Sequence, residues 1–303
     1  MQSRVVSQRL LGKEQRLAQQ KYNSQSGSFT IIRRSQNADS AGSDSKKVWT
    51  LANEEELARL VAKILLGRYL HVEKIIQGRK PKPVAVEGAA ARGAKLRLKV
   101  KKDQDPWHRD GLLFQAISWV AAHKAARGTQ SVFSLPHQIP AHKGFDGLQI
   151  ELSKGGKLSG LIIFEDKATE NPRATIQQDV WPAIKLLETG RRQNELMQET
   201  TALLQRAQIS DPDKLIATIV WKQLRKFRVS ITGGSGHDSD PGLGQLFKDY
   251  DAVAPGKSTE KRRAEVICFS DLRRWMQQFA RKVRIAIDNE SEKKLCSTLK
   301  RPT

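Results

Sequence analysis

The chain contains little cysteine and no ordered set of histidines. Only two cysteines, Cys268 and Cys296, occur in 303 residues, and their spacing matches neither a disulfide framework nor a zinc-ligand pair. The six histidines are scattered, so a histidine-based metal centre is not indicated. No apolar run reaches the ~18 residues that a membrane span requires. We therefore expect a soluble, cytoplasmic protein without a membrane partner.

Acidic residues are also scarce. Lysine and arginine total 53 against 32 aspartate and glutamate residues, which gives a net charge of +21 and a pI near 10.1. Such a surplus indicates a polyanionic partner, and DNA, RNA or an anionic surface would each satisfy it. Hydrophobic residues make up 38% of the chain, enough for a sizeable core in one large domain or two.

The most informative segment follows a glycine-rich turn at residues 144–147, which contains Asp146. Residues 148–152 alternate between apolar and polar, and residues 161–164 form a short continuous apolar run, so the stretch predicts a β-hairpin. Glu165 and Lys167 end this second strand. Because side chains alternate along a strand, both should lie on one face, with Asp166 on the other.

These residue types suit the hydrolysis of a phosphodiester. Magnesium prefers one or two carboxylates together with water and substrate phosphate, and Asp146 and Glu165 could supply them. Lys167 could orient the attacking water, lower its pKa or stabilise the charge that develops on the phosphorus centre. None of these roles requires histidine or cysteine.

This layout resembles the PD-(D/E)XK nuclease superfamily over roughly residues 105–190. The resemblance implies an α/β fold with a restriction-endonuclease-like core, in which a central mixed sheet is flanked by helices. It also implies that Asp146 and Glu165 bind Mg²⁺ or Mn²⁺ and that Lys167 assists the nucleophile. The chain departs from the motif at Phe145, where the superfamily name has proline.

The acid-x-lysine motif alone is common. It also occurs at Asp44-Ser45-Lys46 and Glu292-Lys293-Lys294, but only the copy at residues 165–167 ends an apolar strand. The alternative for that copy is an ordinary strand-end ion pair, with Asp146 as a turn residue.

The preceding segment predicts a helix that begins with Asp105 as N-cap and Pro106 as first residue. Its apolar stripe comprises Leu112, Leu113, Ala116, Ile117, Val120 and Ala121. Superfamily members often carry a further acid on this helix, and Asp110 is the nearest candidate. A solvated first-turn acid favoured by the helix dipole is the alternative.

The segment after the motif predicts a helix from Asn171-Pro172 that is kinked or restarted at Trp181-Pro182. Gln177 and Trp181 are similar to the Gln-x-x-x-aromatic motif of some superfamily members, in which the glutamine supports the site and the nucleic acid. Arg173, one turn before Gln177, could contact a phosphate. An exposed glutamine on an amphipathic helix remains the alternative.

We divide the chain into four regions: a basic, partly mobile N-terminal arm (1–48), a helical region with a basic linker (49–104), the nuclease core (105–190) and a helical and mixed C-terminal extension of that core (191–303). In the second region, a capping box at Asn53 and Glu56 predicts a helix over 54–77. The alternation of Lys95, Arg97 and Lys99 predicts a linker or edge strand within residues 79–102.

The C-terminal region predicts helices over 191–208 and 212–227, strands over 229–232 and 265–269, and a long helix capped by Ser270. The two strands could extend the nuclease sheet or build a small accessory subdomain.

Together these features predict a Mg²⁺-dependent deoxyribonuclease. DNA is the expected substrate, and RNA stays open. By analogy, the extra regions around a small core suggest an effector of bacterial antiviral defence that works beside an ATPase, helicase or sensor subunit or as a homo-oligomer. The alternatives are a catalytically inactive nucleic-acid-binding subunit and a structural subunit of a larger assembly.

Overall fold

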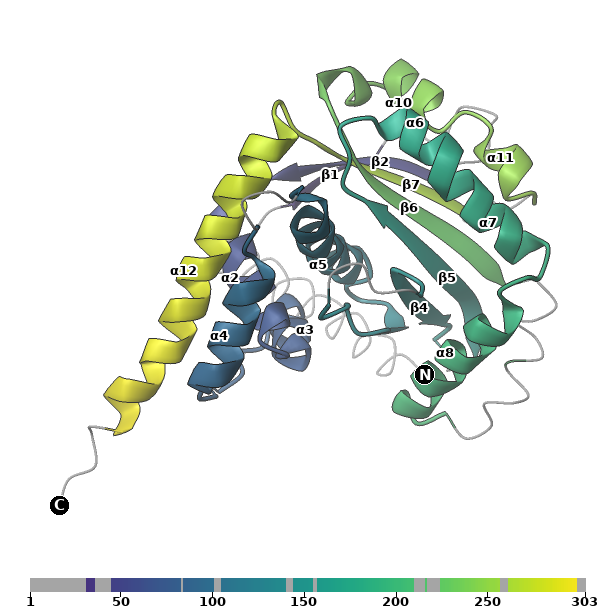
Figure 1. Cartoon of the computed structure of the whole chain (residues 1–303). Helices are drawn as coiled ribbons and strands as arrows, with labels where there is room; N and C mark the ends of the chain where they lie inside the picture. Colours follow the sequence, from purple (N-terminus) through teal and green to yellow (C-terminus); the bar gives the residue numbers. More distant parts are fainter. Residues whose placement is uncertain are drawn as a thin grey trace, which may run out of the picture.

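The computed structural model describes residues 31–35, 45–82, 84–100, 105–139, 144–154, 157–209, 216, 224–256 and 261–298. Within these ranges the chain builds one mixed β-sheet with helices on both faces (Figure 1). The α/β class and the flanked mixed sheet expected from the sequence are therefore confirmed.

The sheet has seven strands in the described ranges, in the order β1-β2-β7-β6-β5-β4-β3. The four central strands β2, β7, β6 and β5 run parallel, whereas β1 at one edge and β4 and β3 at the other pair antiparallel. The strands are β1 (Ile31–Ser35), β2 (Ser45–Leu51), β3 (Gln130–Phe133), β4 (Gly147–Leu152), β5 (Leu158–Lys167), β6 (Arg225–Gly233) and β7 (Arg262–Cys268).

The predicted hairpin is present as β4 and β5. Gly147, the residue after Asp146, pairs with Phe164 across the two strands. A Cβ atom at Gly147 would lie 2.9 Å from Cδ2 of the Phe164 ring. Glycine at this position therefore lets the Asp146 turn lie against the end of β5.

The C-terminal region extends this same sheet, because β6 pairs with β5 and β7 pairs with β6. Both strands predicted there are confirmed, and β6 begins earlier than expected, so that Phe227 lies in a strand. Most of the helix predicted over 212–227 lies outside the described residues. The central sheet thus includes residues from all four regions set out above. Strand β1 and the start of β2 lie within residues 1–48, so this part of the predicted N-terminal arm belongs to the sheet.

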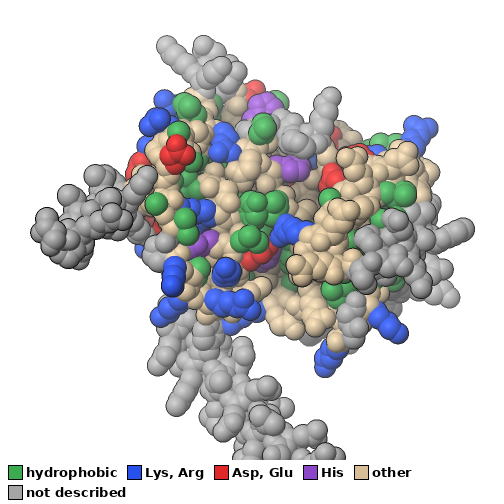
Figure 2. Space-filling view, turned by 90° about the horizontal axis from the view of Figure 1, so that it is seen from below, with side chains coloured by type: hydrophobic (Ala, Val, Ile, Leu, Met, Phe, Trp, Pro, Cys, Tyr) green, Lys and Arg blue, Asp and Glu red, His purple; other side chains and the backbone are tan. Residues whose placement is uncertain are grey.

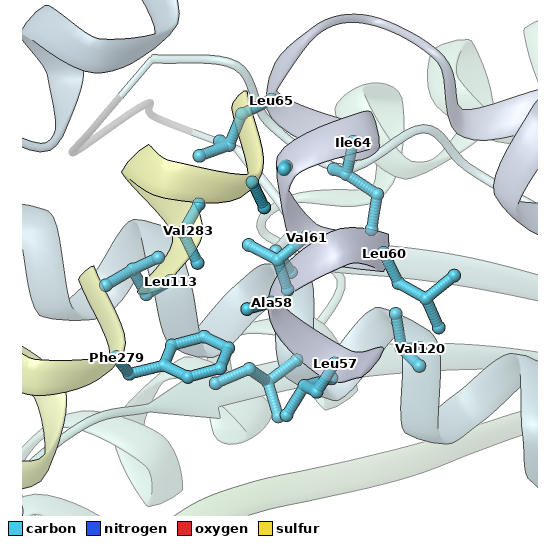
Figure 3. Packing of buried hydrophobic residues seen from close by; sticks show 14 of the residues in the cluster. Leu57, Ala58, Leu60, Val61, Ile64, Leu65, Leu113, Val120, Phe279 and Val283 are labelled. Carbon is cyan, nitrogen blue, oxygen red and sulfur yellow. The ribbon is translucent and has the colours of Figure 1, made fainter. Parts of the chain in front are cut away.

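Five helices cover one face of the sheet: α2 (Glu54–Leu65), α3 (Tyr69–Ile76), α4 (Gly88–Arg97), α5 (Trp107–Ala125) and α12 (Leu272–Thr298). The whole predicted stripe of α5 is buried, as expected for a helix packed on a sheet. In Figure 3, Leu57 and Val61 of α2 pack beside Phe279 and Val283 of α12. No described helix combines the length and apolarity that a membrane crossing demands.

The N-terminal helical region differs from expectation in two places. The predicted cap is confirmed, since Oδ1 of Asn53 accepts a hydrogen bond from the Glu56 N–H, but the helix breaks at Gly67, whose φ is 76°. The linker or edge strand predicted around Lys95 is wrong, because residues 88–97 form α4. This segment is rich in alanine, a strong helix former, and its buried Ala91 and Ala94 follow helical spacing.

The opposite face is covered by α6 (Pro172–Thr175), the π-helical segment η1 (Ile176–Val180), α7 (Trp181–Glu188), α8 (Gln193–Arg206), α10 (Asp240–Leu246) and α11 (Tyr250–Val253). The predicted restart at Trp181 is confirmed, and α8 corresponds to the helix predicted over 191–208. Helix α12 is capped by Asp271 rather than Ser270, because Oδ1 of Asp271 accepts from the Arg274 N–H at 2.9 Å.

A charged network lies between α5 and the centre of the sheet. Arg228 on β6 is 2% exposed. It donates to Oε2 of Glu265 on β7 at 2.6 Å and to Oγ of Ser118 on α5 at 2.7 Å, and its Nη1 lies 3.5 Å from Oδ1 of Asp166 on β5. The indole N–H of Trp49 on β2 also donates to Glu265. The network therefore joins α5 to four parallel strands.

We expect Arg228→Met to lower the free energy of unfolding by about 3–5 kcal/mol, because it leaves two carboxylates buried without their guanidinium. Urea unfolding followed by circular dichroism measures this change. Arg281→Met, on the exposed face of α12, is the control and should change stability by less than about 0.5 kcal/mol. Equal effects of the two substitutions would contradict a structural role for the network.

Candidate functional site

Asp146, Glu165 and Lys167 come together at the carboxyl end of β5. Nζ of Lys167 lies 3.3 Å from Oε2 of Glu165 and 3.5 Å from Oδ2 of Asp146. Glu165 and Lys167 are two residues apart on one strand, so they share a face, and Asp146 reaches them from the turn that opens β4. The three residues selected from the sequence thus form one cluster.

Two hydrogen bonds fix the Asp146 carboxylate. Its Oδ2 accepts from the backbone N–H of Asp166 at 2.8 Å, and its Oδ1 accepts from Nε2 of Gln115 on α5 at 2.5 Å. Both donors belong to buried or half-buried elements, so the carboxylate is held at the edge of the sheet. Gln115 was not selected from the sequence, because its position on the α5 surface gives no local signal.

Asp166 points to the opposite face, as the strand alternation predicts. Its Oδ1 accepts from Oγ of Ser118 at 2.7 Å and lies near Arg228 in the buried network. Asp166 therefore serves the site through its backbone N–H, whereas its side chain anchors β5 to α5.

Burial shapes the ionisation of Glu165. Loss of solvent raises its pKa to about 7, against the attraction of Lys167 and with a further increase from Asp146. Burial also opposes the charge on Lys167, but Asp146 and Glu165 outweigh it and hold the pKa of the ammonium above its usual value. The lysine is therefore a permanent cation beside both carboxylates.

This pair of carboxylates suits a hard divalent cation. Among the described residues, no three histidine, cysteine or acidic side chains lie together in a group that could hold a metal ion. Two carboxylates are nevertheless the number that a magnesium ion uses when water and substrate phosphate complete its shell. The pKa of Glu165 is raised chiefly by burial, and a cation bound between the two carboxylates would favour the ionised form of Glu165.

Arg192 adds a second cation to the surroundings of Glu165. It precedes the first residue of α8, its guanidinium carbon lies 4.2 Å from the centre of the Phe145 ring, and its charge acts to lower the pKa of Glu165. Two hydrogen bonds to Glu195, at 2.6 and 2.8 Å, hold the guanidinium in place. Its sequence neighbourhood is polar and unremarkable, so it was not selected from the sequence.

Asp110 is fully buried and pairs with Arg109 and Arg273, at 2.6 Å in each case. It is therefore not the solvated first-turn acid of the alternative interpretation, and its described contacts are not with the Asp146 cluster. Arg273 also bonds to Glu170. This acid thus joins the start of α5 to the start of α12.

The other two residues predicted to support the site are Arg173 and Gln177, and their described contacts are not with Asp146, Glu165 or Lys167. Arg173 donates to the carbonyls of Leu246 and Lys248 and pairs with Asp249, so it fastens the end of α10. Gln177 is exposed within the π-helical segment, whereas the Trp181 ring is buried and stacks on Tyr250. The π segment changes the helical register between Gln177 and Trp181, so the two do not form one surface pair.

A scan against protein-family models finds no match to this chain, and a search among curated proteins finds none either. Functional inference therefore rests on the geometry of the cluster and on its chemistry.

We expect Glu165→Gln to change how stability depends on pH. The folded-state pKa is raised, so in the wild type the unfolded chain loses the Glu165 proton first, and stability falls as pH rises from about 4.5 to about 7. Glutamine cannot ionise. The variant should therefore gain about 2 kcal/mol relative to wild type between pH 5 and pH 8.

Urea unfolding at both pH values, in buffer containing a chelator, measures this gain. Glu55→Gln, at a largely exposed glutamate, is the matched control and should show no such gain. If the free energy of unfolding changes with pH equally in wild type and Glu165→Gln, then folding does not shift the pKa of Glu165 and the prediction is wrong.

Proposed function

We propose that this chain is a metal-dependent nuclease of the PD-(D/E)XK type that hydrolyses phosphodiester bonds in DNA. The observation that carries the proposal is the convergence of Asp146, Glu165 and Lys167 at the end of one buried strand. An ordinary strand-end ion pair explains Glu165 and Lys167, but it does not require Asp146 to be held beside them by two hydrogen bonds.

The fold supports the same proposal. A restriction-endonuclease-like core has a mixed sheet with a helix before the β4–β5 hairpin, and α5 occupies that position and supplies Gln115 to Asp146. The remaining strands and helices then form additions around this core.

In this proposal the carboxylates of Asp146 and Glu165 hold Mg²⁺ or Mn²⁺. The bound cation supplies neutralisation of charge on the phosphate and activation of water. Lys167 is a fixed positive charge within 3.5 Å of both carboxylates, and it orients the nucleophile or stabilises the developing negative charge. Gln115 and the Asp166 N–H keep Asp146 in the orientation that the site needs.

The charge of the chain favours a nucleic-acid substrate. The net charge is +21, and on the face shown in Figure 2 lysine and arginine side chains are spread widely rather than gathered in one patch. A diffuse positive surface attracts a phosphate backbone without sequence preference. By analogy we assign the protein to bacterial antiviral defence, with an ATPase, helicase or sensor subunit as partner.

The decisive experiment incubates the purified protein with supercoiled, linear and single-stranded DNA and with RNA, at low salt with Mg²⁺ or Mn²⁺. We expect cleavage of DNA that stops on addition of EDTA. Asp146→Ala and Lys167→Ala should each lower the rate at least about 100-fold, since Asp146 would hold the cation and Lys167 would stabilise charge on the reacting phosphate. Product shapes then distinguish endonuclease from exonuclease action.

Lys294→Ala is the matched control, because Lys294 belongs to another acid-x-lysine copy that does not follow an apolar strand. It should cleave at the wild-type rate. If all four proteins bind nucleic acid equally and none cuts it, the chain is a binding subunit and the nuclease proposal is wrong.

A further inference from the structure

One side of α5 runs from the centre of the sheet to the Asp146 cluster and beyond it. The residues on this side recur at intervals of three or four positions, in the order Ser118, Gln115, Gly111 and Trp107. Ser118 donates a hydrogen bond to Asp166 within β5, and Gln115 donates to Asp146 beside the end of that strand. Gly111 and Trp107 follow one and two turns further out, so they extend this side of the helix past the carboxyl end of β5.

The ion pairs of Asp110 place the start of α5 in the fold. Asp110 pairs with Arg273, and Arg273 also pairs with Glu170, which follows Lys167 by three residues. The first two turns of α5 therefore lie next to the segment that leaves the candidate active site.

Gly111 leaves this side of the helix open. In the part of the chain that the structure describes, no atom beyond the adjoining helix lies within 4 Å of the place where a Cβ atom at Gly111 would be. Close packing therefore does not account for the glycine, although glycine inside a helix costs about 1 kcal/mol relative to alanine. The space lies between Trp107 and Gln115, and it gives a bound chain room to approach the helix backbone.

Trp107 presents an aromatic ring at the outer end of this side. It is 62% exposed, whereas Trp49, Trp119 and Trp181 are at most 5% exposed. Tryptophan is highly buried on average, so an exposed one is informative. Among the described residues, Trp107 has no hydrogen-bond or ring partner. The ring and its indole N–H are therefore available to a ligand.

The position of the ring selects a nucleobase as its partner. Eight residues at 1.5 Å each separate Trp107 from Gln115 by about 12 Å along the helix axis, so a nucleic acid bound at the cluster has nearby nucleotides beside the ring. Aromatic side chains stack on unpaired bases. In a duplex the base faces are covered by neighbouring base pairs, and exposing one requires unstacking. The net charge of +21 attracts the phosphates of a single strand as well as those of a duplex.

We propose that Trp107 stacks on an unpaired base of single-stranded DNA whose backbone passes Gly111 on its way to Asp146. The inference rests on the proposed nuclease function and names its substrate as single-stranded DNA. Stacking on Trp107 tolerates every base, because each base has a π face, and it therefore adds affinity without sequence preference.

The experiment measures fluorescence anisotropy of a labelled single-stranded oligonucleotide with the full chain, at low salt in EDTA, so that binding is observed without cleavage. We expect Trp107→Ala to weaken binding at least about fivefold, because it removes a stacked base contact, and Trp107→Phe to weaken it less. A duplex of the same length should bind wild type and Trp107→Ala equally. Leu96→Ala is the matched control, since Leu96 is also 62% exposed, and it should bind as wild type does.

An oligonucleotide with abasic positions shows whether the ring contacts a base. Wild type and Trp107→Ala should bind it equally, and a loss in Trp107→Ala as large as on the normal strand would overturn the proposal. Equal affinity of wild type and Trp107→Ala for the normal strand, or no binding by wild type, would overturn it too.

Cleavage with Mg²⁺ is measured separately, so the two proposals can fail independently. If wild type cuts DNA while Trp107→Ala binds single strands normally, the nuclease proposal stands and the stacking inference is wrong. If Trp107→Ala loses single-strand affinity but wild type cuts nothing, the stacking inference is supported and the nuclease proposal is wrong.

Discussion

The neutralisation of Arg228 inside the protein is the constraint on which the rest of the structure depends. A guanidinium that is 2% exposed cannot remain there without acceptors, and they come from Glu265 on β7, Asp166 on β5 and Ser118 on α5. Glu265 in turn engages the indole of Trp49 on β2. One side chain thus fixes the order of the central strands and the position of α5 above them.

This constraint reaches the candidate active site through Asp166. The side chain of Asp166 is committed to Ser118 and Arg228, so the alternation of β5 turns Glu165 and Lys167 to the other face. The backbone N–H of the same residue fixes Asp146. Alternate residues of β5 therefore contribute to the buried ion network on one face of the sheet and to the cluster of Asp146, Glu165 and Lys167 on the other.

The sequence was informative wherever the determining interactions are local. The hairpin, the stripe of α5 and the cluster of Asp146, Glu165 and Lys167 follow from alternation, periodicity and a short motif. The errors have physical causes: Lys95 and Arg97 alternate like a strand, but alanine propensity makes that segment a helix. Gln115 and Arg192 reach the site only through tertiary contacts. Arg228, Ser230 and Thr232 place buried polar side chains at alternate positions of β6, and this alternation is a local sign of the buried network.

The parallel pairing of β2 with β7 also bears on the order of folding. Trp49 and Glu265 bond across 216 positions of sequence, so β2 is synthesised long before its parallel neighbour exists. Closing so long a loop is slow, because its entropy is lost before the contact forms. Until β7 arrives, Arg228 lacks Glu265 and the support behind β5 is incomplete. The Asp146 site therefore gains its full support only after the strand that contains Glu265 has been synthesised and has paired.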